Sequence, residues 1–390
     1  MSSKVFDEKH EDTLTELKFV EEVRYVMKEY EIEDLDEGVE ETLTQYAERN
    51  VDAASQVDVS EAKRVLRTTI VLPASMKSLA TTLTNPGEPI GKRMRALFYL
   101  RSVGGPTAIG ALRQTLEDKR RNGSLLRHEA AFVLGQMSAR SALPSLEKVL
   151  RDCEDDAMTR HECAEAIGAI GVSEALLQAF ASDKAPEVAE TCMLALDRIR
   201  WQQKERSKGN SEMSAFHSVD PAPPLRDVKS ISKLKDVLLN GEERLFRRYG
   251  ALFALRNVAT EEAVRIIATA LDRDDTSALF RHEVAYVCGQ LSDPIATDAL
   301  CRSLARDTEN VMVRHEAAEA LGAIGTEKCI SVLKDYRNDE SKAVAESCVV
   351  ALDAINYWEN EKDSGITKSE AAKAFAEPIR CSCAGRKVLV

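Results

Sequence analysis

The sequence MTRHECAEAIGAIG at residues 158–171 recurs almost unchanged as MVRHEAAEALGAIG at residues 312–325. A second related pair is LLRHEAAFVLGQM at residues 125–137 and LFRHEVAYVCGQL at residues 279–291. In all four stretches, apolar residues recur at intervals of three and four, which is the spacing of an amphipathic helix. The chain therefore contains an internal duplication of helical segments, and every copy carries the triplet Arg-His-Glu.

These triplets account for four of the six histidines of the chain. The other two, His10 and His217, lie in polar or charged stretches without the preceding arginine, and we treat them as incidental. The other helices expected in the repeats lack a histidine, so duplication alone does not explain the triplets. The four copies are Arg127-His128-Glu129, Arg160-His161-Glu162, Arg281-His282-Glu283 and Arg314-His315-Glu316.

Around the triplets, Pro, Gly, Ser and Asp divide the sequence into short helical stretches. Helix pairs of about 31–34 residues without strands are typical of a repeat solenoid, in which each pair buries its apolar face against its neighbours. The fold class that we expect is all-α, a HEAT-like α-α superhelical solenoid of two symmetric blocks of four helix pairs, plus a helical N-terminal extension. The expected helices span 75–84, 89–103, 106–117, 123–137, 140–152, 156–170, 173–182, 186–203, 228–239, 242–257, 260–271, 277–291, 294–306, 310–324, 327–336 and 341–358.

This pattern divides the chain into five parts. An acidic extension covers residues 1–74, with helices expected near 11–30, 39–49 and 59–71. The repeat blocks cover 75–203 and 228–360, and between them we expect a flexible linker over the proline-containing residues 204–227. A polar tail covers 361–390.

Composition excludes several classes of partner. Residues 1–74 contain 19 Asp and Glu against 9 Lys and Arg, so most of the net charge of −12 belongs to the extension. No basic stripe predicts nucleic-acid binding, and no apolar run approaches the roughly 18 residues of a membrane span. The N-terminus is charged rather than signal-like, and the nine cysteines are scattered through helical patterns. We expect a reduced, cytoplasmic chain.

The spacing of the triplets predicts a metal site. Residues one repeat apart lie at equivalent places on neighbouring parallel helices, whose axes are ~8–10 Å apart. His128 and His161 should therefore converge, and so should His282 and His315. Each following glutamate is rotated by ~100° and flanks the same site. Four histidines and four carboxylates on one buried face are costly unless a cation satisfies them.

The ligand types narrow the choice of metal. Imidazole and carboxylate without thiolate argue against structural zinc. Two histidines with one or two carboxylates per ion are typical of non-haem iron oxygenases, although catalytic zinc and manganese stay open. Eight ligands divide naturally into two ions, which form one dinuclear centre if the blocks face each other and two separate sites if they do not. The four arginines either pair with carboxylates such as Glu165 and Glu319 or lie solvated on the helix surface.

Two blocks of helical repeats with four His-Glu motifs resemble the deoxyhypusine hydroxylase family. The resemblance covers about residues 75–360 and leaves out the N-terminal extension and the last 30 residues or so. It implies O₂-dependent hydroxylation of the aminobutyl-extended lysine (deoxyhypusine) of a translation factor, the last step of hypusine formation, at a centre of two Fe²⁺ ions.

Carried onto this chain, the resemblance implies two ligand sets. His128, Glu129, His161 and Glu162 would serve one ion, and His282, Glu283, His315 and Glu316 the other. Glu129 and Glu283 are also suited to hold the cationic amine of the substrate instead of a metal. Two other classes compete with this interpretation: a non-catalytic HEAT-repeat scaffold, and a chromophore-transferring protein similar to the bilin lyases.

Overall fold

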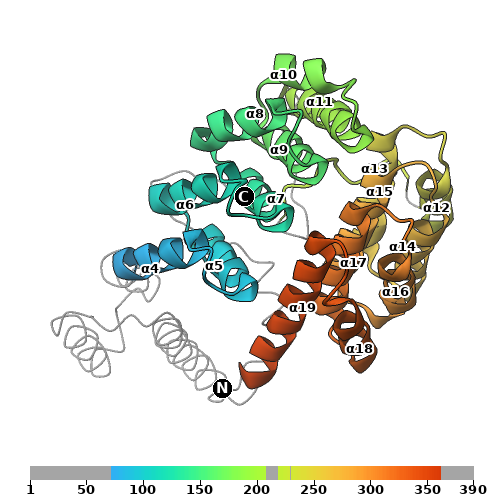
Figure 1. Ribbon diagram of the computed structural model, residues 1–390. Coiled ribbons are helices and arrows are strands. Elements are labelled where there is room, and N and C mark those ends of the chain that lie inside the picture. Colours follow the sequence, from blue (N-terminus) through green and yellow to red (C-terminus); the bar gives the residue numbers. More distant parts are fainter. Residues whose placement is uncertain (1–71, 208–217, 229, 362–390) are drawn as a thin grey trace, which may run out of the picture. The chain divides into compact units, whose positions relative to one another are not determined.

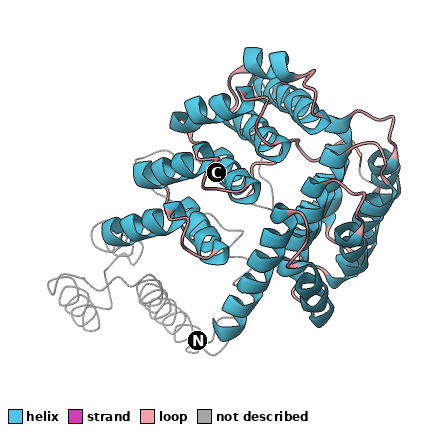
Figure 2. Cartoon of the chain, in the orientation of Figure 1, coloured by secondary structure: helices cyan, strands magenta, loops and turns pink. Residues whose placement is uncertain are grey.

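The computed structural model describes residues 72–207, 218–228 and 230–361. These residues form sixteen α-helices and two short 3₁₀ segments, and no strand occurs among them (Figure 2). The chain divides into two compact units at Asn85. The first unit contains α4 (Leu72–Thr84), and all other described helices belong to the second. The expected all-α repeat fold is confirmed, whereas the helices expected before residue 72 and the tail lie outside the described residues.

Each helix lies close to its expected position. In the first block the helices are α5 (Ile90–Val103), α6 (Gly105–Glu117), α7 (Ser124–Gln136), α8 (Leu143–Arg151), α9 (Ala157–Ile170), α10 (Glu174–Phe180) and α11 (Pro186–Ser207). In the second block they are α12 (Ile231–Leu239), α13 (Leu245–Val258), α14 (Glu261–Arg273), α15 (Ala278–Leu291), α16 (Thr297–Ala305), α17 (Val311–Ile324), α18 (Glu327–Tyr336) and α19 (Lys342–Glu361). No described helix is both long enough and apolar enough to span a bilayer.

The duplicated sequence carries its own helix boundaries. The Asp156 and Asn310 side chains accept hydrogen bonds from the backbone two residues later and so begin α9 and α17. The last glycines of the repeated line, Gly171 and Gly325, have φ of +79° and +64° and end the same helices. Glycine is favoured there because other residues adopt this left-handed conformation at a cost.

The odd-numbered helices form the inside of the second unit. In Figure 1, α5, α7, α9 and α11 follow one another from blue to green, and α13, α15, α17 and α19 from yellow to red. Six of them make a closed series of contacts, in the order α7, α9, α11, α15, α17, α19 and back to α7. The two repeat blocks therefore meet at two seams, α11 with α13 and α15, and α19 with α5 and α7. All four triplets lie on helices of this closed series.

Glycines let these inner helices approach closely. A Cβ atom added to Gly168 would lie 2.5 Å from the Cβ of Ala195, and one added to Gly322 would lie 2.6 Å from the Cβ of Ala351. Neither position has room for even a methyl group. Because a side chain on one helix must reach a ligand shared with the next, the small interhelical spacing that these glycines allow is a condition for the site.

The arginines of the triplets connect successive repeats. Arg127 donates from Nε to the Leu116 carbonyl (2.7 Å) at the end of α6, and from both terminal nitrogens to Asp155 (2.6 Å each) in the turn before α9. Arg160 contacts the Leu150 carbonyl and Asp183 in the same manner. The second block repeats the arrangement with Arg314, which donates to Leu304 and Asp339.

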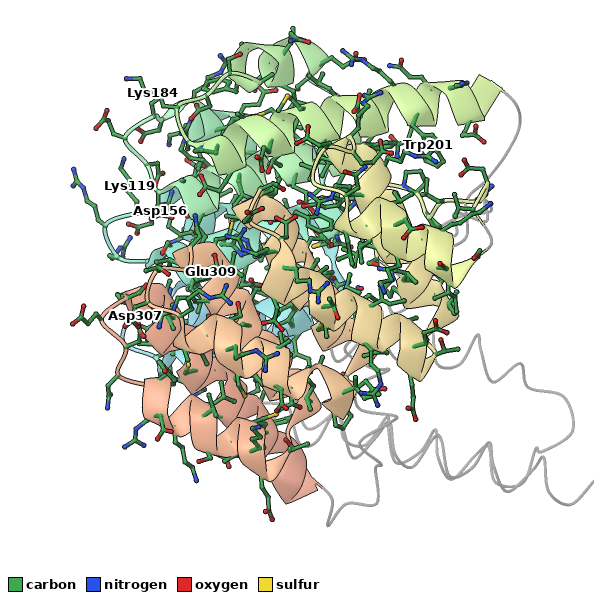
Figure 3. All side chains as sticks on the ribbon, turned by 90° about the vertical axis from the view of Figure 1, so that its right-hand side faces the viewer. Lys119, Asp156, Lys184, Trp201, Asp307 and Glu309 are labelled. Atoms are coloured by element: carbon green, nitrogen blue, oxygen red, sulfur yellow. The ribbon has the colours of Figure 1, made fainter. Side chains whose placement is uncertain are left out.

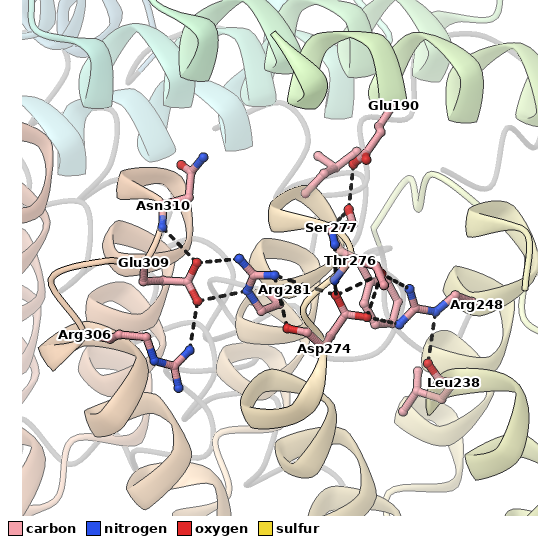
Figure 4. Close-up of polar contacts among 12 residues, drawn as sticks. Glu190, Leu238, Arg248, Asp274, Thr276, Ser277, Arg281, Arg306, Glu309 and Asn310 are labelled. Carbon is pink, nitrogen blue, oxygen red and sulfur yellow. Dashed lines mark hydrogen bonds and ion pairs between the residues drawn. The ribbon is translucent and has the colours of Figure 1, made fainter. Parts of the chain in front are cut away.

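Figure 4 shows the remaining triplet arginine, Arg281, between the carbonyl of Asp274 and the carboxylate of Glu309. The expected pairing of the arginines with Glu165 or Glu319 is therefore wrong. Those glutamates follow the arginines by five positions, which places them about 140° away around the helix. The alternative of a solvated surface is wrong as well, because Arg127 and Arg160 are each only 3% exposed.

Part of the predicted linker is bound to the inner helices. Residues 204–207 continue α11, and 208–217 lie outside the described residues. Val219 exchanges two hydrogen bonds with the side chain of Gln136 on α7. Asp220 accepts from Arg256 on α13 through its carboxylate (2.6 Å) and from Arg198 on α11 through its carbonyl (2.7 Å). We call residues 218–221 the strap.

We expect Gly168→Ala to lower the free energy of unfolding by about 1–3 kcal/mol, because the added methyl overlaps Ala195 and forces α9 away from α11. Gly110→Ala is the matched control. Gly110 lies on the exposed side of α6 with nothing within 4 Å of an added Cβ, so the same change should raise stability by about 0.5–1 kcal/mol. Denaturant unfolding measures both, and equal effects would contradict the close-packing argument.

We expect Arg127→Ala to lower the free energy of unfolding by about 3–5 kcal/mol, because the buried Asp155 is left without its cation. Arg302→Ala removes a pair of similar length, 2.6 Å to Asp272, from side chains that are 56% and 29% exposed. That control should cost less than about 1 kcal/mol. Thermal unfolding compares the two variants, and a small loss for Arg127→Ala would show that the arginine does not hold the repeats together.

Candidate metal centre

The triplets occupy the same place in four inner helices. In each of α7, α9, α15 and α17 the arginine is the fourth residue, so the histidine lies near the N-terminal end. Figure 3 shows the turns that precede inner helices at one side of the unit, where Lys119, Asp156 and Lys184 of the first block and Asp307 and Glu309 of the second are labelled. The four histidines therefore lie at one depth below this side.

The structure brings the four imidazoles together. Within the first block, the ring centroids of His128 and His161 are 5.3 Å apart, and within the second those of His282 and His315 are 5.4 Å apart. Distances between blocks are equally short, 5.0 Å from His128 to His315 and 5.4 Å from His161 to His282. The expected convergence within each block is confirmed. The two repeat blocks therefore face each other across one histidine cluster.

The glutamates of the triplets surround this cluster. Glu162 Oε2 lies 3.2 Å from His128 Nε2, and at the equivalent place in the second block Glu316 Oε2 lies 3.3 Å from His282 Nε2. Glu129 Oε1 lies 3.0 Å from Nδ1 of its own neighbour His128. No side-chain ion pair of Glu283 occurs among the described residues, although Glu283 is only 5% exposed.

Six imidazole nitrogens in this cluster have no hydrogen-bond partner. His161 and His315 are 0% exposed, and both ring nitrogens of each are without one. The Nε2 atoms of His128 and His282 complete the six. Buried polar atoms are nearly always hydrogen-bonded, so each exception needs an explanation. Metal ions would account for four of them, one on each ring, because neutral imidazole binds a metal through a single free nitrogen.

The electrostatics of His161 and His315 agree with this explanation. Burial lowers the pKa of His161 well below its usual value, and His128 and His282 lower it further, so this ring is neutral and ready to bind a metal. Burial also lowers the pKa of His315. For His128, the carboxylates of Glu162 and Glu129 outweigh burial and raise the pKa well above its usual value. Burial raises the pKa of Glu283 well above its usual value, and Glu165 raises it further.

Two groups of side chains place their ligand atoms within 4.8 Å of one another. One group is His128, His161 and Glu162, and the other is His128, His282 and His315. The second group combines residues from both blocks. The donor set, imidazole and carboxylate without a cysteine, fits the non-haem iron class, since no thiol belongs to either group.

One layer of side chains was not singled out from the sequence as part of the site. Four residues follow the histidines by four positions and therefore lie on the same helix faces. Phe132 and Tyr286 meet edge to face, with ring centroids 5.9 Å apart. Glu319 Oε1 lies 3.7 Å from His315 Nδ1, and Glu165 is the equivalent residue of the first block. The spacing of four after each histidine is the sequence signal that identifies this layer.

Comparison with known proteins agrees with the fold. Residues 123–197 match the family of HEAT repeats and residues 313–339 that of the PBS lyase HEAT-like repeat. A deoxyhypusine hydroxylase of Drosophila pseudoobscura pseudoobscura is 45% identical over 310 residues, which cover 78% of this chain and 100% of the relative. The human deoxyhypusine hydroxylase is 46% identical over 290 residues, 74% of this chain and 93% of the relative.

A solved structure of human deoxyhypusine hydroxylase in complex with glycerol is similar to this chain with a TM-score of 0.68 and 45% identity, covering 72% of this chain and 96% of the human chain. Identity of this degree over nearly the whole length of these relatives confirms the resemblance expected from the triplets. The chain is an enzyme that belongs to the deoxyhypusine hydroxylase family.

Proposed function

We propose that this chain hydroxylates the deoxyhypusine side chain of a translation factor, using O₂ and two Fe²⁺ ions, in the last step of hypusine formation. One observation supports this most directly: four buried imidazoles from two repeat blocks cluster with neighbouring ring centroids 5.0–5.4 Å apart, and six of their nitrogens have no hydrogen-bond partner. A scaffold protein has no use for such an arrangement, because every unpaired buried nitrogen lowers its stability.

We assign the ligands by block, in agreement with the family resemblance. His128, His161 and Glu162 would hold one ion, and His282, His315 and Glu316 the other. Glu129 and Glu283 either complete these two sets or hold the amine of the substrate. The short distances between blocks, 5.0 Å from His128 to His315, support a single centre that would hold both ions.

Iron(II) in such a centre supplies the electrons and the binding site for O₂. The side chains of this protein have other tasks. The closed series of inner helices excludes water from the imidazoles, which are at most 7% exposed, and so prevents loss of the oxidising equivalents to solvent. The arginine contacts between repeats hold the histidine-bearing turns in register, as second-shell contacts do at other metal sites.

The substrate class follows from charge. An aminobutyl-extended lysine carries amines that are protonated at neutral pH, and the pocket contains more carboxylates than basic side chains. We place the partner, a deoxyhypusine-containing translation factor, and the enzyme in the cytoplasm. We propose no nucleic-acid or membrane partner.

We expect His161→Ala to remove at least one iron per chain and to lower hydroxylation of the deoxyhypusine-containing protein by about 100-fold or more, because a ligand is lost. His217→Ala is the control, since His217 has no triplet around it. Metal analysis and product formation measure both variants. Full iron content and activity of His161→Ala would refute the assignment of that histidine.

We expect chelation of the iron to lower the unfolding temperature by about 5 °C or more. A ligand present at 100 times its Kd stabilises the native state by about 2.7 kcal/mol, and each kcal/mol shifts the midpoint by about 2–4 °C in a domain of 150–250 residues. Scanning calorimetry before and after chelation measures the shift, and His161→Ala should show a smaller one. Identical midpoints would argue against a metal bound by the buried histidines.

A further inference from the structure

The layer of side chains that follows the histidines by one helical turn is the part of the pocket nearest to solvent. Phe132, Glu165, Tyr286 and Glu319 are all partly exposed, whereas the histidines above them are buried. On α17, for example, the His315 side chain is 0% exposed and that of Glu319 is 24% exposed. A substrate side chain that reaches the centre from this direction passes these four residues.

In the half of this layer that contains Glu165, the strap and two arginines, Arg198 and Arg256, lie against the side chains. Glu165 shares a cavity of about 10 Å³ with Arg198, Val219 and Pro221, which has room for no more than one water molecule. Arg256 is 0% exposed and paired with Asp220 of the strap. The hydrogen bonds that hold the strap go to α7, α11, α13 and α15. This half of the layer is therefore covered, and basic groups lie next to its carboxylates.

In the half that contains Glu319, no lysine or arginine of the described residues pairs with the carboxylates. There Glu129 of α7 and Glu319 of α17 come from opposite blocks, and neither forms an ion pair with lysine or arginine within the described ranges. Ser347 donates a hydrogen bond of 3.3 Å to Glu319. Since no lysine or arginine of the described ranges pairs with them, these two carboxylates can accept an ammonium group from a ligand.

The proposed metal centre adjoins the same place. His315 is fully buried and neither of its ring nitrogens has a hydrogen-bond partner, and its Nδ1 lies 3.7 Å from Glu319 Oε1. On the path between the two halves, Phe132 and Tyr286 present their rings to each other at 5.9 Å. Aromatic faces and edges pack well against methylene groups, and they attract nearby ammonium groups.

We propose that Glu319, together with Glu129, binds the terminal ammonium of the substrate's aminobutyl side chain, and that Phe132 and Tyr286 contact its methylene groups. The inference rests on the proposed function and deepens it, because it selects one of two equivalent halves. Glu319 is the binding residue, whereas its counterpart Glu165 is covered by the strap and faces Arg198.

The test is the affinity of the iron-loaded, full-length enzyme for the deoxyhypusine-containing protein, measured without O₂ so that no turnover occurs. We expect Glu319→Gln to weaken binding by about tenfold or more, since a charge-assisted contact to the ammonium is lost, and to bind the deoxyhypusine and unmodified lysine forms almost equally. The iron content should stay that of the wild type. Glu165→Gln is the matched control and should change the affinity by less than about threefold.

Three outcomes would overturn the proposal: wild-type affinity of Glu319→Gln, loss of iron from that variant, or equal weakening by Glu165→Gln. Both substitutions keep the size of the side chain, and circular dichroism checks that both variants fold. A wild-type enzyme that does not prefer the deoxyhypusine form over the lysine form would refute the proposed function itself. A wild type with that preference and an unaffected Glu319→Gln would refute only the role of Glu319.

Discussion

Burial of carboxyl groups is the constraint on which the rest of the structure depends. Removal of a carboxylate from water costs several kcal/mol unless a cation or a proton compensates it, and a whole domain is stable by only about 5–15 kcal/mol. The triplet arginines do not compensate these groups, because each is already paired with an acid in a turn. The buried carboxyl groups therefore need other cations nearby, and metal ions and a cationic substrate can supply the positive charge. The carboxyl groups concerned are Glu129, Glu162, Glu165, Glu283, Glu316 and Glu319.

The helix ends and the side-by-side placement of equivalent residues in neighbouring repeats are predictable from the sequence. Asp156 and Gly171 mark the ends of one inner helix, and the same residue types or their equivalents recur at the ends of its copy, so both helices are bounded correctly. Convergence of His128 with His161 also follows from the sequence alone, since repeated residues on stacked parallel helices lie side by side. These predictions need only the period of the repeat and the geometry of one helix.

Contacts over long distances in the chain are less predictable. The partner of Arg160 is Asp183, 23 residues later in a turn, and nothing in the helical period of α9 singles out that aspartate. The 5.0 Å between His128 and His315 depends on how α19 meets α7 and how α11 meets α15. Such seams are set by side-chain packing between surfaces more than 80 residues apart in sequence, as in the hydrogen bond from Ser277 to Glu190 (Figure 4). A repeat period contains no information about them.

Duplication also creates a problem that the strap solves. Two equivalent blocks present two equivalent sets of ligands, which suits a pair of identical metal ions. A single side chain of a partner protein is not symmetric, however, and it would meet two equivalent carboxylates, Glu165 and Glu319, with no preference. The strap belongs to neither block's repeats, and its Asp220 binds Arg198 and Arg256 on one half only. A short segment between the blocks thus converts a nearly symmetric pocket into one with a single cation-binding side.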